Sequence, residues 1–169
     1  MMKKILIMLM LALPLGVMAQ NFKFGHVYMS EIIVMMPEYN TAKTEMETLQ
    51  KQYVDEIQKA DQEMQKKYTE YTAQRDSLPQ SIRERREKEI QDLAQRGEEF
   101  KAEVEQILGQ KQQELTEPII RKANDALKAV GTEKSFTYIF DLSQTPIPFV
   151  NEQQSIDVTA DVKAKLGIQ

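Results

Sequence analysis

The sequence predicts a mainly α-helical protein, in which a long antiparallel helical hairpin rests on a small β-rich base. Charged residues make up 28% of the 169 positions and hydrophobic residues 41%, with only 6 Gly and 6 Pro. This balance is typical of long, solvated helices. Strong helix formers dominate residues 40–130. Short segments that alternate aromatic and small or polar residues lie on either side of this stretch, and alternation of this kind indicates strands.

The two predicted helices span roughly residues 37–77 and 82–130. Pro37 suits a first helical turn, where its missing amide hydrogen costs nothing. The break falls at Pro79, because the residue before a proline is pushed out of helical geometry. A connection this short makes the two helices antiparallel neighbours, with the tip of the hairpin near 78–81.

Residue types at the ends of the second helix indicate where it begins and ends. Ser81 and Glu84 have the spacing of a capping box, and Gly131 is expected to end the helix. Within it, Gly97 and Gly109 each lower helix stability by about 1 kcal/mol relative to Ala. The hairpin therefore contains weak points away from its tip.

The apolar side chains of the two helices follow different repeats. Those of the first helix recur in an 11-residue pattern, and those of the second in an ordinary heptad. Because the two patterns do not match along their length, we expect an imperfect seam and arms that bend. The positions are Met46, Leu49, Tyr53, Ile57, Ala60, Met64, Tyr68 and Tyr71 in the first helix, and Ile90, Leu93, Gly97, Phe100, Val104 and Ile107 in the second.

The base is expected to contain residues 20–36 and 131–169, leaving 37–130 for the arm. Residues 22–28 alternate like a half-buried strand, and Ser30 can cap a short helix that ends at Met36.

After the arm, residues 136–140 alternate again. Pro146 and Pro148 mark a turn or sheet edge, and 149–150 is a second short strand. Thr159 can cap a last helix that Gly167 ends. Strands from both ends of the chain must meet if the hairpin is to be closed.

So small a base is expected to need a partner. Cores of about 60 residues rarely support themselves without disulfides, metal ions or oligomerisation. The sequence has no Cys and one His, which leaves oligomerisation. The candidate association residues are Val27, Ile32, Ile139, Phe140, Phe149, Val150, Val158, Val162 and Leu166.

Several function classes are disfavoured. The formal charge of −4 lacks the basic footprint of a nucleic-acid binder. The sequence contains no phosphate-binding loop, zinc-protease pattern or nucleophile elbow. Structural roles explain His26, Asp157 and Thr159 better than catalytic ones. We therefore predict no enzymatic activity, no catalytic or metal-binding residue and no cofactor.

The first 19 residues are predicted to be a cleavable export signal. Lys3 and Lys4 precede an apolar run, and Val17-Met18-Ala19 fits the small-x-Ala pattern of signal peptidase. Removal of the two lysines leaves 20 basic and 26 acidic residues, a net charge of −6. The expected location is the periplasm.

The order of these segments resembles the Skp/OmpH family of periplasmic chaperones for outer-membrane proteins. The resemblance covers essentially the whole mature chain. Its most specific element is Asp157-Val158-Thr159 followed by a short amphipathic helix with Leu166. The other matching segments are residues 24–32, Met36-Pro37-Glu38-Tyr39, Glu117-Pro118-Ile119-Ile120, residues 123–130, Tyr138-Ile139-Phe140-Asp141 and Ser155-Ile156.

The resemblance implies a jellyfish-shaped homotrimer, in which three β-rich bases associate and three arms enclose a cavity. An unfolded outer-membrane protein is held there without ATP, which prevents its aggregation. Adaptable side chains on the arms are candidates for weak client contacts. These candidates are Met46, Tyr53, Met64, Tyr68, Tyr71 and Phe100.

The charge of this chain departs from that of the best-known family members, which are strongly basic. Between residues 40 and 130 the sequence has 16 basic and 19 acidic residues. This argues against binding of lipopolysaccharide or an anionic membrane. The alternative function is a structural coiled-coil adaptor of the cell envelope that binds a folded partner. The two differ in whether the bound protein is unfolded or folded.

Overall fold

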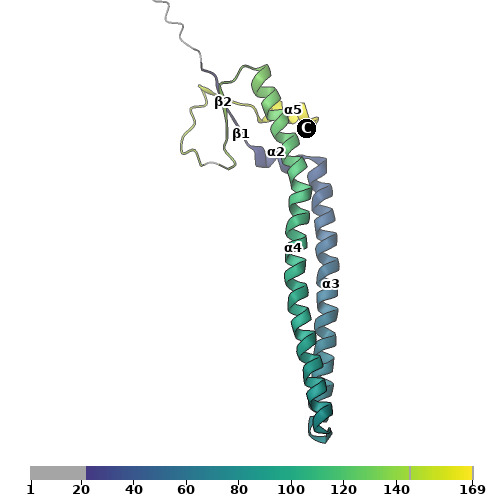
Figure 1. Ribbon diagram of the computed structural model, residues 1–169. Coiled ribbons are helices and arrows are strands. Elements are labelled where there is room, and N and C mark those ends of the chain that lie inside the picture. The colour runs from purple at the N-terminus through teal and green to yellow at the C-terminus, as the bar shows by residue number, and fades with distance from the viewer. Residues whose placement is uncertain (1–21, 145, 169) are drawn as a thin grey trace, which may run out of the picture.

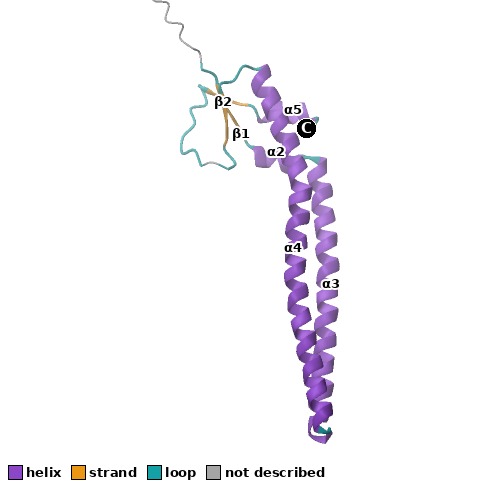
Figure 2. Cartoon of the chain, in the orientation of Figure 1, coloured by secondary structure: helices purple, strands orange, loops and turns teal. Residues whose placement is uncertain are grey.

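The protein is a long, thin helical hairpin with a small mixed base at one end (Figure 1). The computed structural model describes residues 22–144 and 146–168, so the predicted export signal lies outside the described residues. In chain order the elements are β1 (Phe24–Val27), α2 (Met29–Met35), α3 (Pro37–Gln74), the 3-10 turn η1 (Arg75–Ser77), α4 (Gln80–Glu133), β2 (Tyr138–Asp141), β3 (Ser155–Asp157) and α5 (Thr159–Leu166). Helix dominates, as the sequence predicted (Figure 2).

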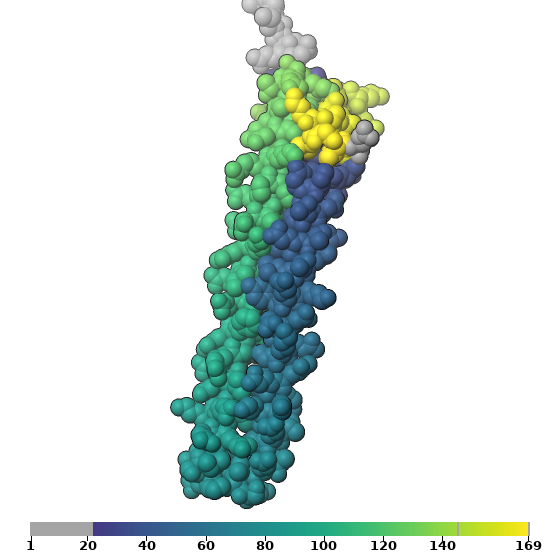
Figure 3. All heavy atoms as spheres, turned by 90° about the vertical axis from the view of Figure 1, so that its right-hand side faces the viewer, coloured from purple at the N-terminus to yellow at the C-terminus, as the bar shows by residue number. Residues whose placement is uncertain are grey.

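Helices α3 and α4 run side by side from the base to the tip (Figures 1 and 3). At a rise of about 1.5 Å per residue, the 38 residues of α3 span about 60 Å and the 54 residues of α4 about 80 Å. Pro37 lies in the first turn of α3, as predicted. The extra length of α4 continues past the start of α3 into the base.

The predicted capping box at the start of α4 is wrong. The helix begins at Gln80, one residue before Ser81, and its N-cap is Pro79, with no side-chain hydrogen bond. The Pro79 carbonyl accepts from the amides of Ile82 and Arg83. Glu84 instead accepts from the Gln80 side-chain amide at 2.8 Å. Proline at this position already fixes the chain direction, so the serine is not needed as a cap.

Gly131 does not end α4, which continues to Glu133. Lys134 is the C-cap, and Ser135 follows it with a φ of 54°, in the left-handed region. The amide of Phe136 donates to the Gly131 carbonyl, and the amide of Ser135 donates to the Thr132 carbonyl. These two bonds form a Schellman motif, in which serine takes the position that glycine usually holds.

The sheet has three parallel strands in the order β2-β1-β3, so strands from the two ends of the chain meet as predicted. In the register of β1 and β2, Phe24 lies opposite Tyr138 and His26 opposite Phe140. The predicted strand at 149–150 is wrong, because the third strand is Ser155–Asp157. Gly25 lies where two strands and a ring converge: a Cβ atom there would lie 2.9 Å from the Phe136 ring and 3.2 Å from the Ile156 carbonyl oxygen.

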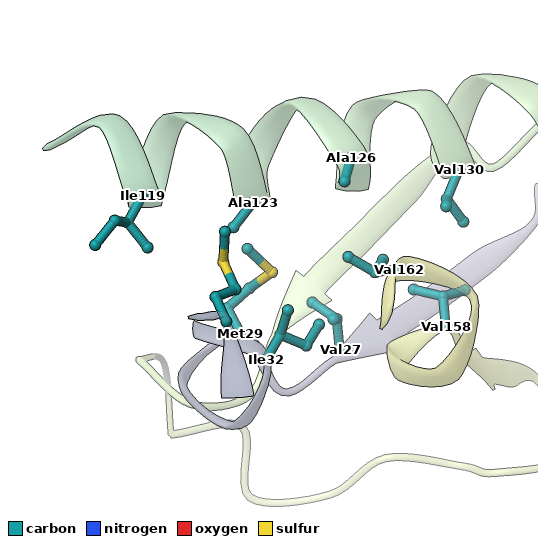
Figure 4. Close-up of a cluster of buried hydrophobic side chains, with 10 residues drawn as sticks. Val27, Met29, Ile32, Ile119, Ala123, Ala126, Val130, Val158 and Val162 are labelled. Atoms are coloured by element: carbon teal, nitrogen blue, oxygen red, sulfur yellow. The ribbon is translucent and has the colours of Figure 1, made fainter. Parts of the chain in front are cut away.

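One hydrophobic core joins the sheet to all the helices of the base. Ile119, Ala123, Ala126 and Val130 form a stripe along α4 at helical spacing. Figure 4 shows this stripe facing residues of β1, α2 and α5. These facing residues are Val27, Met29, Ile32, Val158 and Val162. The last part of α4 therefore belongs to the base, whereas the sequence placed the arm boundary at 130.

The start of α2 is capped by the other end of the chain. The sequence placed a cap at Ser30, but the helix begins at Met29 without a local side-chain cap. Its amides instead donate across more than 100 residues of sequence: Tyr28 to the Thr159 hydroxyl at 3.1 Å and Met29 to Asp141 Oδ1 at 3.2 Å. These bonds fix α2 against the sheet. At the far end, α5 runs from Thr159 to Leu166. The predicted cap at Thr159 is wrong, because the N-cap is Val158, which makes no side-chain cap hydrogen bond, whereas Gly167, with a φ of 72°, is the C-cap as predicted.

Candidate interaction surfaces

One face of the sheet carries a row of exposed aromatic rings. Parallel register places Phe24, Tyr138 and Phe140 on the same face, and Phe22 continues the row. Adjacent rings are stacked with centroids 6.2–6.4 Å apart. Val27 and Ile139 alternate to the opposite side, which packs on the core. We call the four exposed rings the aromatic face.

The connection between β2 and β3 turns the aromatic face into a groove. Residues 142–154 contribute Leu142, Ile147, Phe149, Val150, Asn151 and Gln154 to its lining. Phe24, His26, Phe140 and Ser155 form the rest, around a volume of about 330 Å³. The Phe149 side chain is 79% exposed. An apolar groove next to exposed rings is the kind of surface that associates with another protein.

His26 is the one polar ring beneath this surface and is only 7% exposed. Its Nδ1 lies 2.9 Å from the Ser155 hydroxyl, which ties β1 to β3. The Tyr28 ring meets it edge-on at 6.1 Å. Asp157 lies on β3, as Ser155 does, and its Oδ1 accepts a hydrogen bond from the amide of Thr159 at 2.8 Å. Asp157 therefore serves the start of α5.

The association residues predicted from the sequence divide into two groups. Val27, Ile32, Val158 and Val162 have no exposed surface within a single chain. A side chain enclosed in this way cannot contact a second copy directly, so these four form the core that supports the surface. Ile139, Val150 and Leu166 are half-buried, while Phe140 and Phe149 are exposed. The sequence missed Phe22, Phe24 and Tyr138, although the same alternation could have indicated them.

The predicted client-contacting residues of the arm mostly face the partner helix of the hairpin. Met46, Tyr53, Met64 and Phe100 are half-buried, and the Tyr53 and Phe100 rings lie 6.3 Å apart. Tyr71 is buried, and its hydroxyl donates to Glu87 of α4. Only Tyr68, 50% exposed, lies open on the arm. Val54 and Ile120 are also exposed there and were missed.

Ion pairs cross the hairpin at four levels along its length. The pairs are Lys67–Glu89 at 2.7 Å, Lys101–Asp61 at 3.3 Å, Lys111–Glu45 at 2.9 Å, and Lys122–Glu38. The hydrogen bond from Lys122 lowers the pKa of Glu38, and that from Lys67 lowers the pKa of Glu89. Exposed pairs of this kind contribute little energy each, so they set the register of the two helices more than their stability.

The contact between His26 and Ser155 does not amount to a catalytic site. A nucleophile and base need a third group that is hydrogen-bonded to the base, but Asp157 accepts its hydrogen bond from Thr159 and interacts with His26 through its charge alone. Within residues 22–144 and 146–168, no three His, Asp or Glu side chains lie close enough together to hold a metal ion. Over the same residues, no helix is both long enough and apolar enough to cross a membrane.

Comparison with known proteins agrees with this architecture. The family model described as "Outer membrane protein (OmpH-like)" matches residues 23–166. Among solved structures, an OmpH-like protein from Caulobacter crescentus CB15 has a TM-score of 0.72 at 12% identity. The match covers 86% of this chain and 83% of the other. No curated protein matches the sequence. The family match spans both strand-bearing ends and the whole arm, so the chain belongs to the OmpH-like family.

Proposed function

We infer that this protein is an ATP-independent holdase of the periplasm. It would bind unfolded outer-membrane β-barrel proteins between its helical arms and prevent their aggregation. Family membership supports this reading, as does the fold shared with the Caulobacter protein, which is described there as a candidate outer membrane chaperone. The observation that carries the proposal is that the base and the arm have different surfaces. Exposed aromatic rings cluster on the base, while the long arm has few apolar side chains on its outside.

The aromatic face and its groove are the proposed self-association surface. Phe24, Tyr138, Phe140 and Phe149 lie next to one another and would leave water when a second copy covers them. A closed ring of identical copies is the ordinary way to bury such a surface. Three bases joined in this way would direct three arms to one side and enclose a space between them.

The arms suit enclosure better than tight binding. Tyr68, Val54 and Ile120 are scattered apolar contacts on an otherwise charged and amide-rich surface. An unfolded barrel strand exposes alternating apolar side chains and unpaired backbone groups, which drive aggregation between molecules. Separating one client molecule from the next is enough to prevent this aggregation, so many weak contacts with the client are sufficient. An adaptor for a folded helical partner would instead need a continuous apolar stripe on the outside of the arm.

The charge limits the partners. With the predicted leader removed the chain carries −6, so nucleic acid, lipopolysaccharide and anionic membranes are poor partners. The proposed partners are unfolded outer-membrane proteins and further copies of this chain. The proposal includes no enzymatic step and no cofactor.

An aggregation assay tests this function directly. A β-barrel protein is diluted from urea into buffer without nucleotide, and light scattering is followed with increasing amounts of the purified mature protein. We expect suppression to be complete near one assembled oligomer per client. A matched reaction with the helical hairpin deleted between residues 50 and 104 keeps the base and should fail to protect.

If the full-length protein associates with itself but protects no barrel protein, the holdase proposal is overturned. The alternative function, an adaptor for a folded partner, is then favoured, and capture of a folded envelope protein by the arm would support it. Protection that requires ATP would also contradict the proposal. These outcomes separate the two functions because one depends on an unfolded client and the other on a folded one.

A further inference from the structure

The single histidine of this chain lies in the middle of the proposed association surface. His26 is in β1, the central strand, on the face that carries Phe24 and Phe140. It also lines the groove to which Phe149 contributes. Histidine is the side chain whose ordinary pKa places its change of charge between pH 5 and 8. A group that can gain a charge therefore lies where the surface otherwise offers apolar rings.

We propose that His26 is an acid sensor for self-association, and that protonation of its imidazole weakens the contact between copies of this chain. The proposal rests on the self-association proposed above and adds its regulation. His26 lines the groove and is 7% exposed, so a second copy that covers the groove removes the little contact with water that the imidazole has. A charge cut off from water is costly. Because all copies in a closed ring are identical, each brings the same positive charge to the contact.

The groups around His26 decide how much of this cost is offset. On its own strand, Tyr28 meets the ring edge-on. On β3, the Ser155 hydroxyl lies 2.9 Å from Nδ1, and the carboxylate of Asp157 interacts with the charge of His26. On α5, the charge of Lys163 also interacts with Asp157. Toward β2 the neighbour is Phe140, and the groove residues from 142–154 that the structure describes carry no titratable side chain. Among the residues that the structure describes, Asp157 is therefore the carboxylate that faces the imidazole, and it also interacts with Lys163.

Asp157 keeps its own charge throughout the relevant pH range. Burial alone would raise its pKa, but hydrogen bonds from the hydroxyl and amide of Thr159 outweigh this, and the net pKa is lowered. Its carboxylate stays ionised between pH 5.5 and 7.5 and remains engaged at the start of α5. It can retain a protonated His26 within a single chain, whereas the apolar surface of an incoming copy offers no comparable partner. Acid should therefore separate the copies without unfolding them.

Sedimentation velocity at pH 7.5 and pH 5.5 tests the proposal. The mature protein is used without a polyhistidine tag, together with His26→Gln, which keeps a hydrogen-bonding side chain but cannot be charged. We expect the wild-type concentration for half-assembly to rise about tenfold or more at pH 5.5. The variant should assemble equally at both pH values. Circular dichroism at each pH checks that the helical content is unchanged.

The outcomes distinguish this inference from the proposed function. A wild-type protein that is monomeric at pH 7.5 contradicts the self-association itself. Equal assembly of the wild type at both pH values overturns the acid sensor alone, as does a variant that keeps the full pH dependence.

If the variant does not fold, the wild type still provides a test, because His26 is the only histidine in the sequence and its ring protons can be followed by NMR. Its titration should then differ between dilute and concentrated protein. Identical titrations at the two concentrations would overturn the proposal.

Discussion

At the scale of single residues, two glycines on the same chain have opposite roles. A Cβ atom at Gly25 would lie within 3.2 Å of a backbone oxygen that cannot easily move, whereas one at Gly97 would meet nothing within 4 Å. The first position requires glycine because strands and a ring converge on it. The second is a glycine in the interior of α4, where it only adds flexibility to the unfolded chain.

Gly25→Ala and Gly97→Ala should therefore change stability in opposite directions. We expect Gly25→Ala to lower the free energy of unfolding by about 1–3 kcal/mol, because the sheet must open to fit the methyl group. Gly97→Ala should raise it by up to about 1 kcal/mol through helix propensity. Urea denaturation at one fixed protomer concentration measures both. A neutral or stabilising Gly25→Ala would show that the strand and ring are not closely packed there.

At the scale of elements, the sequence predicted what depends on long periodic patterns. The two long helices, their break and the meeting of both chain ends followed from composition, Pro79 and aromatic alternation. Local end signals were less reliable, and at α2 the predicted signal failed because distant groups cap the helix. Ser30 is not needed as a cap because Asp141 and Thr159 reach the start of α2 from the other end of the chain.

The third strand was missed for a related reason. Ser155–Asp157 has only three residues, too few to show alternation, and it exists because β1 offers it a free edge. The apolar pair Phe149 and Val150 has the composition of a strand but lies in the connection and lines the groove. The faces of the sheet were also assigned incompletely, because an alternating strand pattern shows which residues share a face but not which of the two faces the helices will cover. Val27 was therefore grouped with Phe140, although the two point to opposite faces.

The start of α5 should be sensitive to acid through Asp157. Its pKa is lower in the folded protein than the ordinary 3.8. A lowered pKa adds stability above the ordinary value, and this is lost as the pH falls from about 4 through the folded pKa. Asp157→Asn should therefore lower the free energy of unfolding by about 0.5–1 kcal/mol at pH 6, a modest figure because the carboxylate is partly exposed.

Urea midpoints at pH 6 and pH 3 provide the measurement. The difference between wild type and Asp157→Asn should be smaller at pH 3 than at pH 6, because the stability from the lowered pKa of Asp157 is lost as the pH falls through it. Glu103→Gln, on the exposed surface of α4, serves as the control and should leave both midpoints unchanged. A difference that stays constant with pH would mean that the charge of Asp157 contributes nothing to the bond with Thr159.

At the scale of the whole molecule, a small hydrophobic core in the base anchors a long helical arm. Helix α4 passes without interruption from the tip of the arm into the core, where Ile119 and Val130 pack on the sheet and α5. Movement of the arm is thereby coupled to the base that we propose to associate. The base has two surfaces with separate tasks: one side of the sheet holds α4, and the aromatic face on the other side is open. Substitutions on adjacent residues can separate these tasks, because side chains alternate along β2.

Ile139→Asp and Phe140→Asp should give different products, although the sequence placed both residues in one group of candidate association residues. Ile139 is half-buried and packs against the core, so a carboxylate placed there should unfold the base. Phe140 is 44% exposed within one chain, so Phe140→Asp should stay folded but sediment as a monomer. Circular dichroism and sedimentation velocity, each at matched concentration, separate the two effects. A folded Phe140→Asp that still assembles like the wild type would remove the aromatic face from the association surface, and the copies would then have to meet elsewhere on the base.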